Sequence, residues 1–107
     1  MHRDTSEAQE RLIQNVAKGS SWQFFFYRDN NNVEVDLILV RGAESIPIEI
    51  KLSRSPNEQM VTSLRSLGRI LRSERSYLLS SRKEPLTMSE GIRSVYWYGF
   101  VRNGIGV

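Results

Sequence analysis

The chain has 107 residues and a net charge of +3, with 39% hydrophobic and 25% charged residues, which is typical of one globular domain and excludes a disordered tail. It contains no cysteine and a single histidine, His2, which excludes disulfides and thiolate zinc sites and argues against a histidine-based triad. No apolar run is long enough to span a bilayer and no signal peptide is expected at the start, so we predict a cytoplasmic protein without a membrane anchor.

The first part of the chain predicts a helix, an aromatic strand and a turn. Residues 5–18 repeat apolar side chains at helical spacing. Residues 22–28 include three consecutive phenylalanines and a tyrosine, which favours a strand. Residues 29–32, Asp-Asn-Asn-Asn, predict a tight turn because both residue types tolerate left-handed backbone and bond their own main chain.

Two segments with period-two alternation then predict an antiparallel hairpin. They span residues 33–40 and 45–52 and are joined by a short loop at 41–44. The positions expected to share one apolar face are Val33, Val35, Leu37 and Leu39 in the first strand, and Ile46, Ile48, Ile50 and Leu52 in the second.

The second half predicts a crossover helix followed by two strands. Ser55 as N-cap, Pro56 at the first helical position and Glu58 form a capping box, and the helix should run to about Ser73. Residues 75–80 should form a strand, 81–90 a polar loop and 93–101 a final strand. A helical crossover makes the strands before and after it parallel.

The expected order is α-β-β-β-α-β-β, an α/β (α+β) domain with a mixed sheet flanked by helices. One domain spans residues 1–107, with frayed ends at 1–4 and 103–107.

The charged face of the hairpin is the candidate site. A loop at 41–44 places Asp36 opposite Glu49 and Glu34 opposite Lys51. Opposed side chains have Cβ atoms about 5 Å apart, where two carboxylates repel each other. A divalent cation between them removes that repulsion, and oxygen ligands suit Mg²⁺ or Mn²⁺. Lys51 on the same face can orient water or offset charge on a phosphoryl group.

A simpler interpretation is a solvent-exposed hairpin face on which Glu34 and Lys51 form an ordinary ion pair. Two observations favour the metal site. Ile38 and Val40 share the charged face, which indicates that it is partly covered, and the aromatic strand at 22–28 should place the hairpin inside the sheet.

A family resemblance rests on the same residues. Asp36, twelve further residues and then Glu49-Ile50-Lys51 resemble the D…(D/E)-x-K signature of the restriction-endonuclease-like PD-(D/E)xK superfamily. More narrowly, residues 24–28, 34–36 and 46–51 resemble an uncharacterised domain found C-terminal to AAA-type ATPase modules in prokaryotic proteins. The resemblance covers roughly residues 8–80.

The resemblance implies a restriction-endonuclease-like fold and specific residue roles. Asp36 and Glu49 would bind the metal, with the backbone carbonyl of Ile50 as a candidate third ligand. Lys51 would be the catalytic lysine. A glutamate from the first helix would complete the site, with Glu10 as the candidate and Glu7 as the substitute.

Two functions follow, and the sequence leaves both open. One is Mg²⁺-dependent or Mn²⁺-dependent cleavage of nucleic acid, with DNA the expected partner. The other is a non-catalytic module that contacts protein or DNA for an AAA-type ATPase. The chain has no G-x-x-x-x-G-K-[ST] phosphate-binding loop, so it would then be a detached C-terminal domain of such an ATPase.

The basic second half offers a nucleic-acid surface. Residues 1–50 have a net charge of −3 and residues 51–107 a net charge of +6. The candidates for contact with a phosphate backbone are Arg54, Arg65, Arg69 and Arg72, the last three along one side of the predicted helix. A solvated helix face explains this stripe equally well. The aromatic residues at 96–100 favour packing in the core or in an interface, such as that of a homodimer, over stacking on bases.

Overall fold

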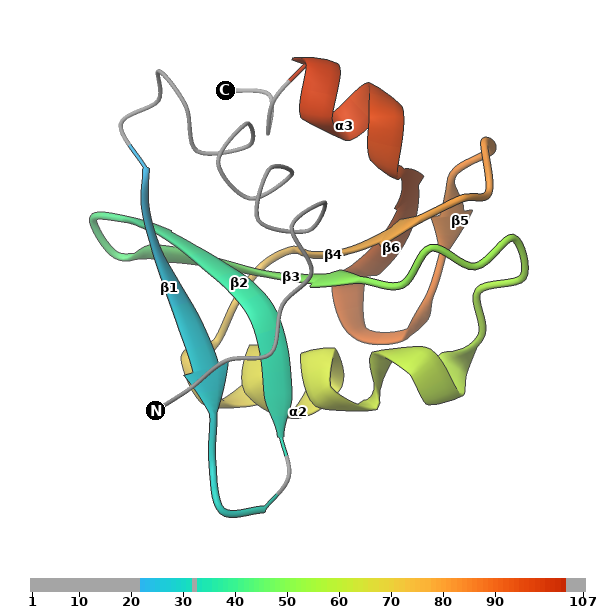
Figure 1. Cartoon of the computed structure of the whole chain (residues 1–107). Coiled ribbons are helices and arrows are strands. Elements are labelled where there is room, and N and C mark those ends of the chain that lie inside the picture. The colour runs from blue at the N-terminus through green and yellow to red at the C-terminus, as the bar shows by residue number, and fades with distance from the viewer. Residues whose placement is uncertain (1–21, 32, 104–107) are drawn as a thin grey trace.

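A computed structural model describes residues 22–31 and 33–103 of the chain. It contains one six-stranded mixed sheet with strand order β1-β2-β3-β4-β6-β5 and helices on both faces (Figure 1). The strands are β1 (Gln23–Arg28), β2 (Glu34–Arg41), β3 (Glu44–Ile50), β4 (Ser76–Ser80), β5 (Leu86–Thr87) and β6 (Ile92–Tyr96). The helical elements are η1 (Glu58–Val61), α2 (Thr62–Leu71), η2 (Ser89–Gly91) and α3 (Trp97–Asn103). This confirms the predicted α/β class, whereas the predicted helix at 5–18 lies outside the described residues.

The first three strands form an antiparallel meander, in which the pairing of β2 with β3 has the predicted register. Strand β2 pairs with β1 on one side and β3 on the other, so the hairpin does lie inside the sheet. The β2–β3 ladder runs from Arg41↔Glu44 to Leu37↔Ile48, which is the alignment predicted from the loop at 41–44. The turn after β1 also forms, because the Asp29 carboxylate accepts hydrogen bonds from the backbone of Asn31 and Val33.

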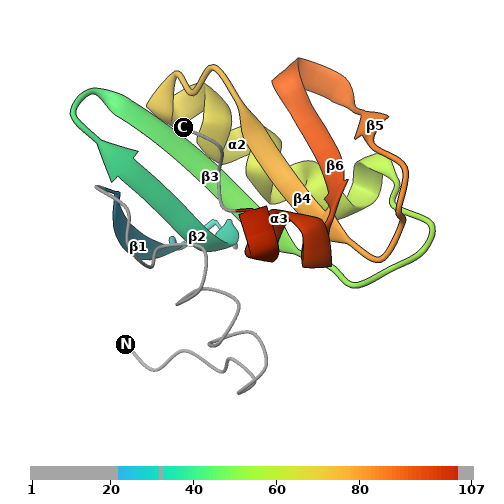
Figure 2. The same cartoon turned by 90° about the horizontal axis from the view of Figure 1, so that it is seen from above.

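The crossover between β3 and β4 has the predicted geometry. The chain leaves β3, passes through η1 and α2 on one face of the sheet, and returns as β4, parallel to β3. Strand β6 then adds parallel to β4, and α3 lies on the face opposite α2 (Figures 1 and 2). The carboxyl ends of β3, β4 and β6 therefore meet at one edge of the sheet.

Each face of the sheet carries its own apolar cluster. Under α2 the fully buried side chains include Val61, Leu64 and Leu67. On the opposite face Ile46, Ile48 and Ile50 pack as predicted. Burying a side chain of this size contributes about 1.5–3 kcal/mol, so both clusters hold the sheet in place. No helix in the described part of the chain is long and apolar enough to cross a membrane.

A β-bulge in β2 changes which residues share a face. Phe25 pairs with Ile38 but Tyr27 pairs with Val35, so a single residue of β1, Phe26, faces two residues of β2. A bulge of this kind bends the strand and redirects its side chains. Val33 and Val35 consequently pack in the α2 cluster, whereas Leu37 and Leu39 pack in the opposite one. The prediction that these four share one face is wrong.

The second half of the predicted strand at 93–101 is a helix. The ladder between β4 and β6 ends at Ser80↔Tyr96, and the chain then turns into α3. Trp97, Phe100 and Val101 pack against the cluster opposite α2, at a spacing of three and four residues that fits a helix. Aromatic strand propensity concealed this periodicity.

Three smaller predictions about the connecting segments are also wrong. The crossover helix begins at η1, where the side chain of Asn57, not Ser55, accepts a hydrogen bond from the amide of Met60. The predicted loop at 81–90 contains the short strand β5 and the turn η2. Leu52, expected on an apolar strand face, lies beyond the end of β3 with 53% of its surface exposed.

Candidate metal and phosphate site

Asp36 lies where strands β2 and β3 stop pairing. The last pair of the ladder is Leu37↔Ile48. Just beyond it, the backbone N–H of Ile50 donates a 2.8 Å hydrogen bond to Oδ2 of Asp36. Asp36 is also one of the two β2 residues that face Phe26 in the bulge. Bulge and hydrogen bond together aim the carboxylate of Asp36 into the opening between the strands.

Glu49 reaches the same opening from β3 and is almost fully buried, with 6% of its surface exposed. Burial, a hydrogen bond to the Asp36 side chain and repulsion by its charge raise the pKa of Glu49 to about 9, although Lys51 acts in the opposite direction. A buried carboxylate beside a second carboxylate is costly to ionise unless a cation joins them. The predicted meeting of Asp36 and Glu49 is thus present in the structure.

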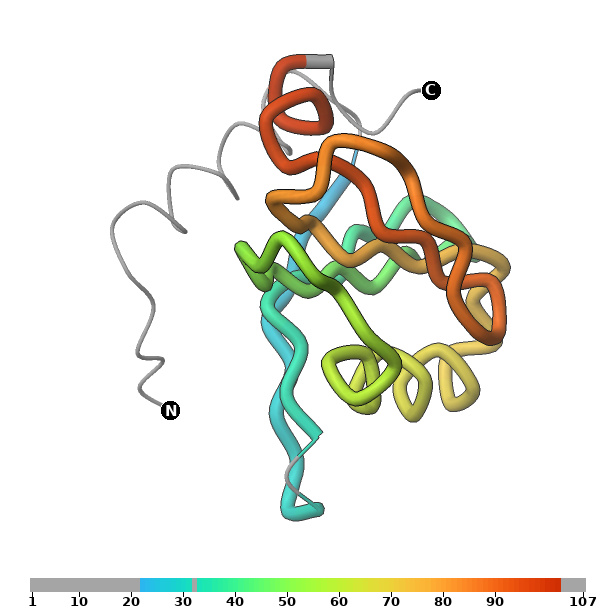
Figure 3. Tube along the Cα trace, turned by 90° about the vertical axis from the view of Figure 1, so that its right-hand side faces the viewer, coloured from blue at the N-terminus to red at the C-terminus, as the bar shows by residue number. Residues whose placement is uncertain are grey.

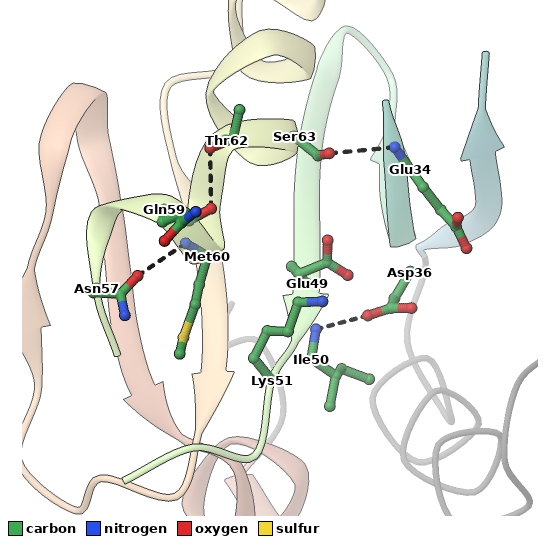
Figure 4. A pocket seen from close by; sticks show the side chains of 10 residues that line it. All are labelled: Glu34, Asp36, Glu49, Ile50, Lys51, Asn57, Gln59, Met60, Thr62 and Ser63. Carbon is green, nitrogen blue, oxygen red and sulfur yellow. Dashed lines mark hydrogen bonds between the residues drawn. The ribbon is translucent and has the colours of Figure 1, made fainter. Parts of the chain in front are cut away.

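Lys51 follows β3 directly and shares its pocket with the two carboxylates (Figure 4). Its amide donates to the carbonyl of Leu79 in β4, which fixes the backbone at this point. Glu34, the predicted ion-pair partner of Lys51, binds Arg28 instead, at 2.9 Å. Within residues 22–31 and 33–103 Lys51 forms no salt bridge, so the simple ion-pair interpretation of this face does not hold.

The three side chains open into a pocket of about 510 Å³ between the sheet and the start of the crossover helix. One wall is the charged face of β2 and β3, and the other is polar and comes from η1 and α2 (Figure 4). The lining residues are Glu34, Asp36, Glu49, Ile50, Lys51, Asn57, Gln59, Met60, Thr62 and Ser63. Ser63 ties the two walls together, because its hydroxyl accepts a hydrogen bond from the amide of Glu34.

The donor set fits a hard divalent cation. Mg²⁺ is commonly held by one or two carboxylates and keeps several waters, so Asp36 and Glu49 are a sufficient protein contribution. Because the N–H of Ile50 faces Asp36, its carbonyl lies on the same side of the strand and is a candidate third donor. No group of three or more His, Cys, Asp or Glu in the described part of the chain could hold a metal ion.

Of the remaining predicted site residues, the four arginines that the structure describes do not line the pocket. Glu10 and Glu7 lie outside the described residues. Arg65 and Arg69 line α2 but are bound by carboxylates: Arg65 to Glu58 at 2.8 Å, and Arg69 to both oxygens of Glu90 at 2.6 and 2.7 Å. Arg54 and Arg72 are exposed.

The sequence did not reveal the polar wall of the pocket. Asn57, Gln59, Thr62 and Ser63 belong to a helix start, where polar residues are common, so their types alone carried no functional signal. Only the position of the crossover helix, above the carboxyl end of β3, brings them opposite Asp36 and Glu49. To find these residues from the sequence, one would have had to predict where along the sheet the crossover helix packs.

The chain is similar to a family whose function is not known. A family model described as "Domain of unknown function (DUF4143)" matches residues 7–99. No curated protein matches the chain, and no solved structure does.

Proposed function

Because the chain belongs to the DUF4143 family, whose function is unknown, we propose its activity from the chemistry of its own residues: metal-dependent cleavage of phosphodiester bonds in nucleic acid. The site resembles that of the PD-(D/E)xK superfamily, with Asp36 and Glu49 as metal ligands and Lys51 as the catalytic lysine. The observation that carries the proposal is the convergence of these three side chains on one pocket.

The carboxylates explain why a cation is needed. Glu49 is buried beside Asp36, and its pKa is raised above its ordinary value by burial and by Asp36. A divalent cation close to Glu49 would offset the cost of charging this buried carboxyl at neutral pH. Mg²⁺ or Mn²⁺ bound there would supply a Lewis acid for a phosphate and for a water nucleophile.

Residues of the chain would position the metal ligand, orient water or phosphate, and bind the nucleic acid. The bond from Ile50 holds Asp36 in place before any ligand arrives, which lowers the cost of organising the site. The Lys51 ammonium has no salt bridge to the described residues, so its N–H donors can orient a water or a phosphate oxygen. The polar groups of Gln59 and Ser63 face the same space and can bind the sugar-phosphate chain.

A second function is favoured by the exposed aromatic strand. Phe24, Phe25 and Phe26 of β1 are 41%, 51% and 51% exposed. Strand β1 is at one end of the sheet, and apolar groups in such a place often mark a protein contact. A non-catalytic module of an AAA-type ATPase would use this strand rather than the pocket.

A cleavage assay distinguishes the two functions. Purified protein is incubated with plasmid DNA, oligonucleotides and RNA in the presence of Mg²⁺, Mn²⁺ or chelator. We expect cleavage with either metal, none with chelator, and losses on the order of a hundredfold or more in Asp36→Asn and Glu49→Gln. Glu74→Gln is the matched control, since Glu74 is an exposed carboxylate that does not line the pocket. Intact substrates under all of these conditions would favour the interaction module.

A further inference from the structure

We propose that the nucleic acid is held by a basic patch on two loops at the carboxyl edge of the sheet, next to the pocket. The loop patch consists of Lys51, Arg54, Arg82 and Lys83. The inference deepens the proposed function, on which it rests for the identity of the substrate. It replaces the arginine stripe of α2 as the main phosphate-binding surface.

Two loops distant in sequence are fastened together at this edge. The loop after β3 and the loop after β4 lie side by side (Figure 3). The amide of Ser81 donates a 2.9 Å hydrogen bond to the carbonyl of Ser53, and the amide of Lys51 donates to Leu79. The Ser80 hydroxyl accepts a hydrogen bond from the amide of Arg82 and shares another with Ser94. These bonds hold the loops in a fixed arrangement, so their charges form one surface.

The loop patch is strongly positive, and three of its four basic residues are exposed. Residues 51–57 and 81–85 contain four basic residues and one acidic residue, Glu84. Lys51, Arg54 and Lys83 are exposed and form no salt bridge with the described residues. Arg82 donates through Nε to the carbonyl of Glu84, a neutral acceptor, and it forms no salt bridge with the part of the chain that the structure describes. Cations in this state are available for phosphate contacts.

The stripe on α2 differs in this respect. Arg65 and Arg69 are held by Glu58 and Glu90, which also lie on the surface. A phosphate would have to displace those carboxylates and would be repelled by them. Of the three arginines of the stripe only Arg72, at the end of α2, has no salt bridge to the described residues.

The loop patch also continues the pocket. Lys51 lines the pocket and begins the loop that carries Arg54, so the pocket and the loop patch share this residue. Phosphates beside the scissile bond would contact the loops, while the scissile phosphate itself would lie at Asp36 and Glu49.

The test compares two charge-matched double variants. Arg54→Gln/Lys83→Gln alters the loop patch, and Arg69→Gln/Arg72→Gln alters the stripe; each removes two positive charges. Binding of labelled duplex and single-stranded DNA is measured in chelator, where no cleavage occurs, at several salt concentrations. Cleavage with Mg²⁺ is measured separately, and thermal unfolding verifies that each variant is folded.

We expect the loop variant to bind DNA about tenfold more weakly, with a salt slope reduced by roughly two, because each lost phosphate contact removes about 0.9 from that slope. The stripe variant should change affinity by less than about twofold. Equal losses in the two variants, a larger loss in the stripe variant, or wild-type protein that binds no nucleic acid would overturn the inference. Selective loss of binding without any cleavage would support the loop patch and contradict the proposed catalysis. Cleavage and binding that are unaffected in the loop variant would contradict the loop patch and support the proposed catalysis.

Discussion

The backbone amide of Ile50 donates a hydrogen bond to the carboxylate of Asp36 just beyond the point where their strands stop pairing. In a continuous ladder that amide would bond to a backbone carbonyl. Here the Asp36 side chain replaces that carbonyl as the acceptor. The same hydrogen bond therefore accompanies the end of the β2–β3 pairing and fixes the position of the carboxylate. The bond also directs Asp36 toward Glu49, which is why two acids lie together in a partly covered pocket.

The first prediction concerns stability against pH in the absence of metal. The pKa of Glu49 is raised by burial and by Asp36, above an unfolded value of about 4.3. Between the unfolded pKa and the folded pKa of about 9, the folded state binds more protons than the unfolded state. Glu49 therefore stabilises the fold most below the unfolded pKa, and this contribution is lost as pH rises through the folded pKa.

Glu49→Gln removes this pH dependence, since its amide can donate to Asp36 as the protonated acid does. We expect the free energy of unfolding at pH 8 to increase by up to about 5 kcal/mol in chelator, since one pKa unit corresponds to about 1.4 kcal/mol. Urea denaturation at pH 6, 7 and 8 measures it, with Glu74→Gln as control. A variant less stable than wild type at every pH would show that the charged Glu49 side chain has a structural role.

The second prediction concerns the proton released by metal binding. The raised pKa of Glu49 means that the carboxyl is largely protonated at neutral pH and must ionise to bind a cation. The affinity for Mn²⁺ should rise with pH, by up to about tenfold per unit below the pKa of Glu49. Calorimetry in two buffers of different ionisation enthalpy counts the protons. Affinity that is independent of pH, with no proton release, would place the ion elsewhere.

The third prediction separates Lys51 from the metal ligands. Lys51→Ala should bind Mn²⁺ as well as wild type or better, because a neighbouring positive charge is removed. Cleavage should nevertheless fall on the order of a hundredfold or more, as expected for a lost charge stabiliser. Metal titration and cleavage are measured on the same preparation. Normal cleavage in this variant would remove Lys51 from the mechanism.

The fourth prediction tests the corrected start of the crossover helix. Asn57→Ala should lower stability by about 1 kcal/mol, because its side chain accepts a bond from the amide of Met60. Ser55→Ala should change stability by less than about 0.5 kcal/mol, since no cap depends on its hydroxyl. Thermal unfolding of both variants decides between the two caps. A larger loss at Ser55 would restore the cap expected from the sequence.

The register of the central hairpin is predictable from sequence, and the site depends on it. A loop at 41–44 and alternating apolar residues allow few alignments, since a slip of one residue would move every side chain to the other face. The amino-acid pattern alone therefore places Asp36 opposite Glu49. The parallel pairing of β3 with β4 follows from the length of the crossover.

Features set by tertiary contacts could not be predicted in this way. The bulge opposite Phe26 arises from pairing between β1 and β2, and nothing in the local sequence marks it. Tyr96 ends β6 because its partner strand β4 ends at Ser80. The pairing of Arg69 with Glu90 joins two elements far apart in the chain, so helical spacing alone could not show that a carboxylate occupies the stripe.

Binding of Mn²⁺ to Asp36→Asn and to wild-type protein, followed by electron paramagnetic resonance, tests the shared-ion site most directly. Glu74→Gln provides the control for loss of one surface charge. We expect a bound-ion signal in wild type and in the control, and a loss of affinity on the order of tenfold or more in Asp36→Asn. Equal Mn²⁺ affinity in all three proteins would contradict the claim that Asp36 and Glu49 hold one metal ion.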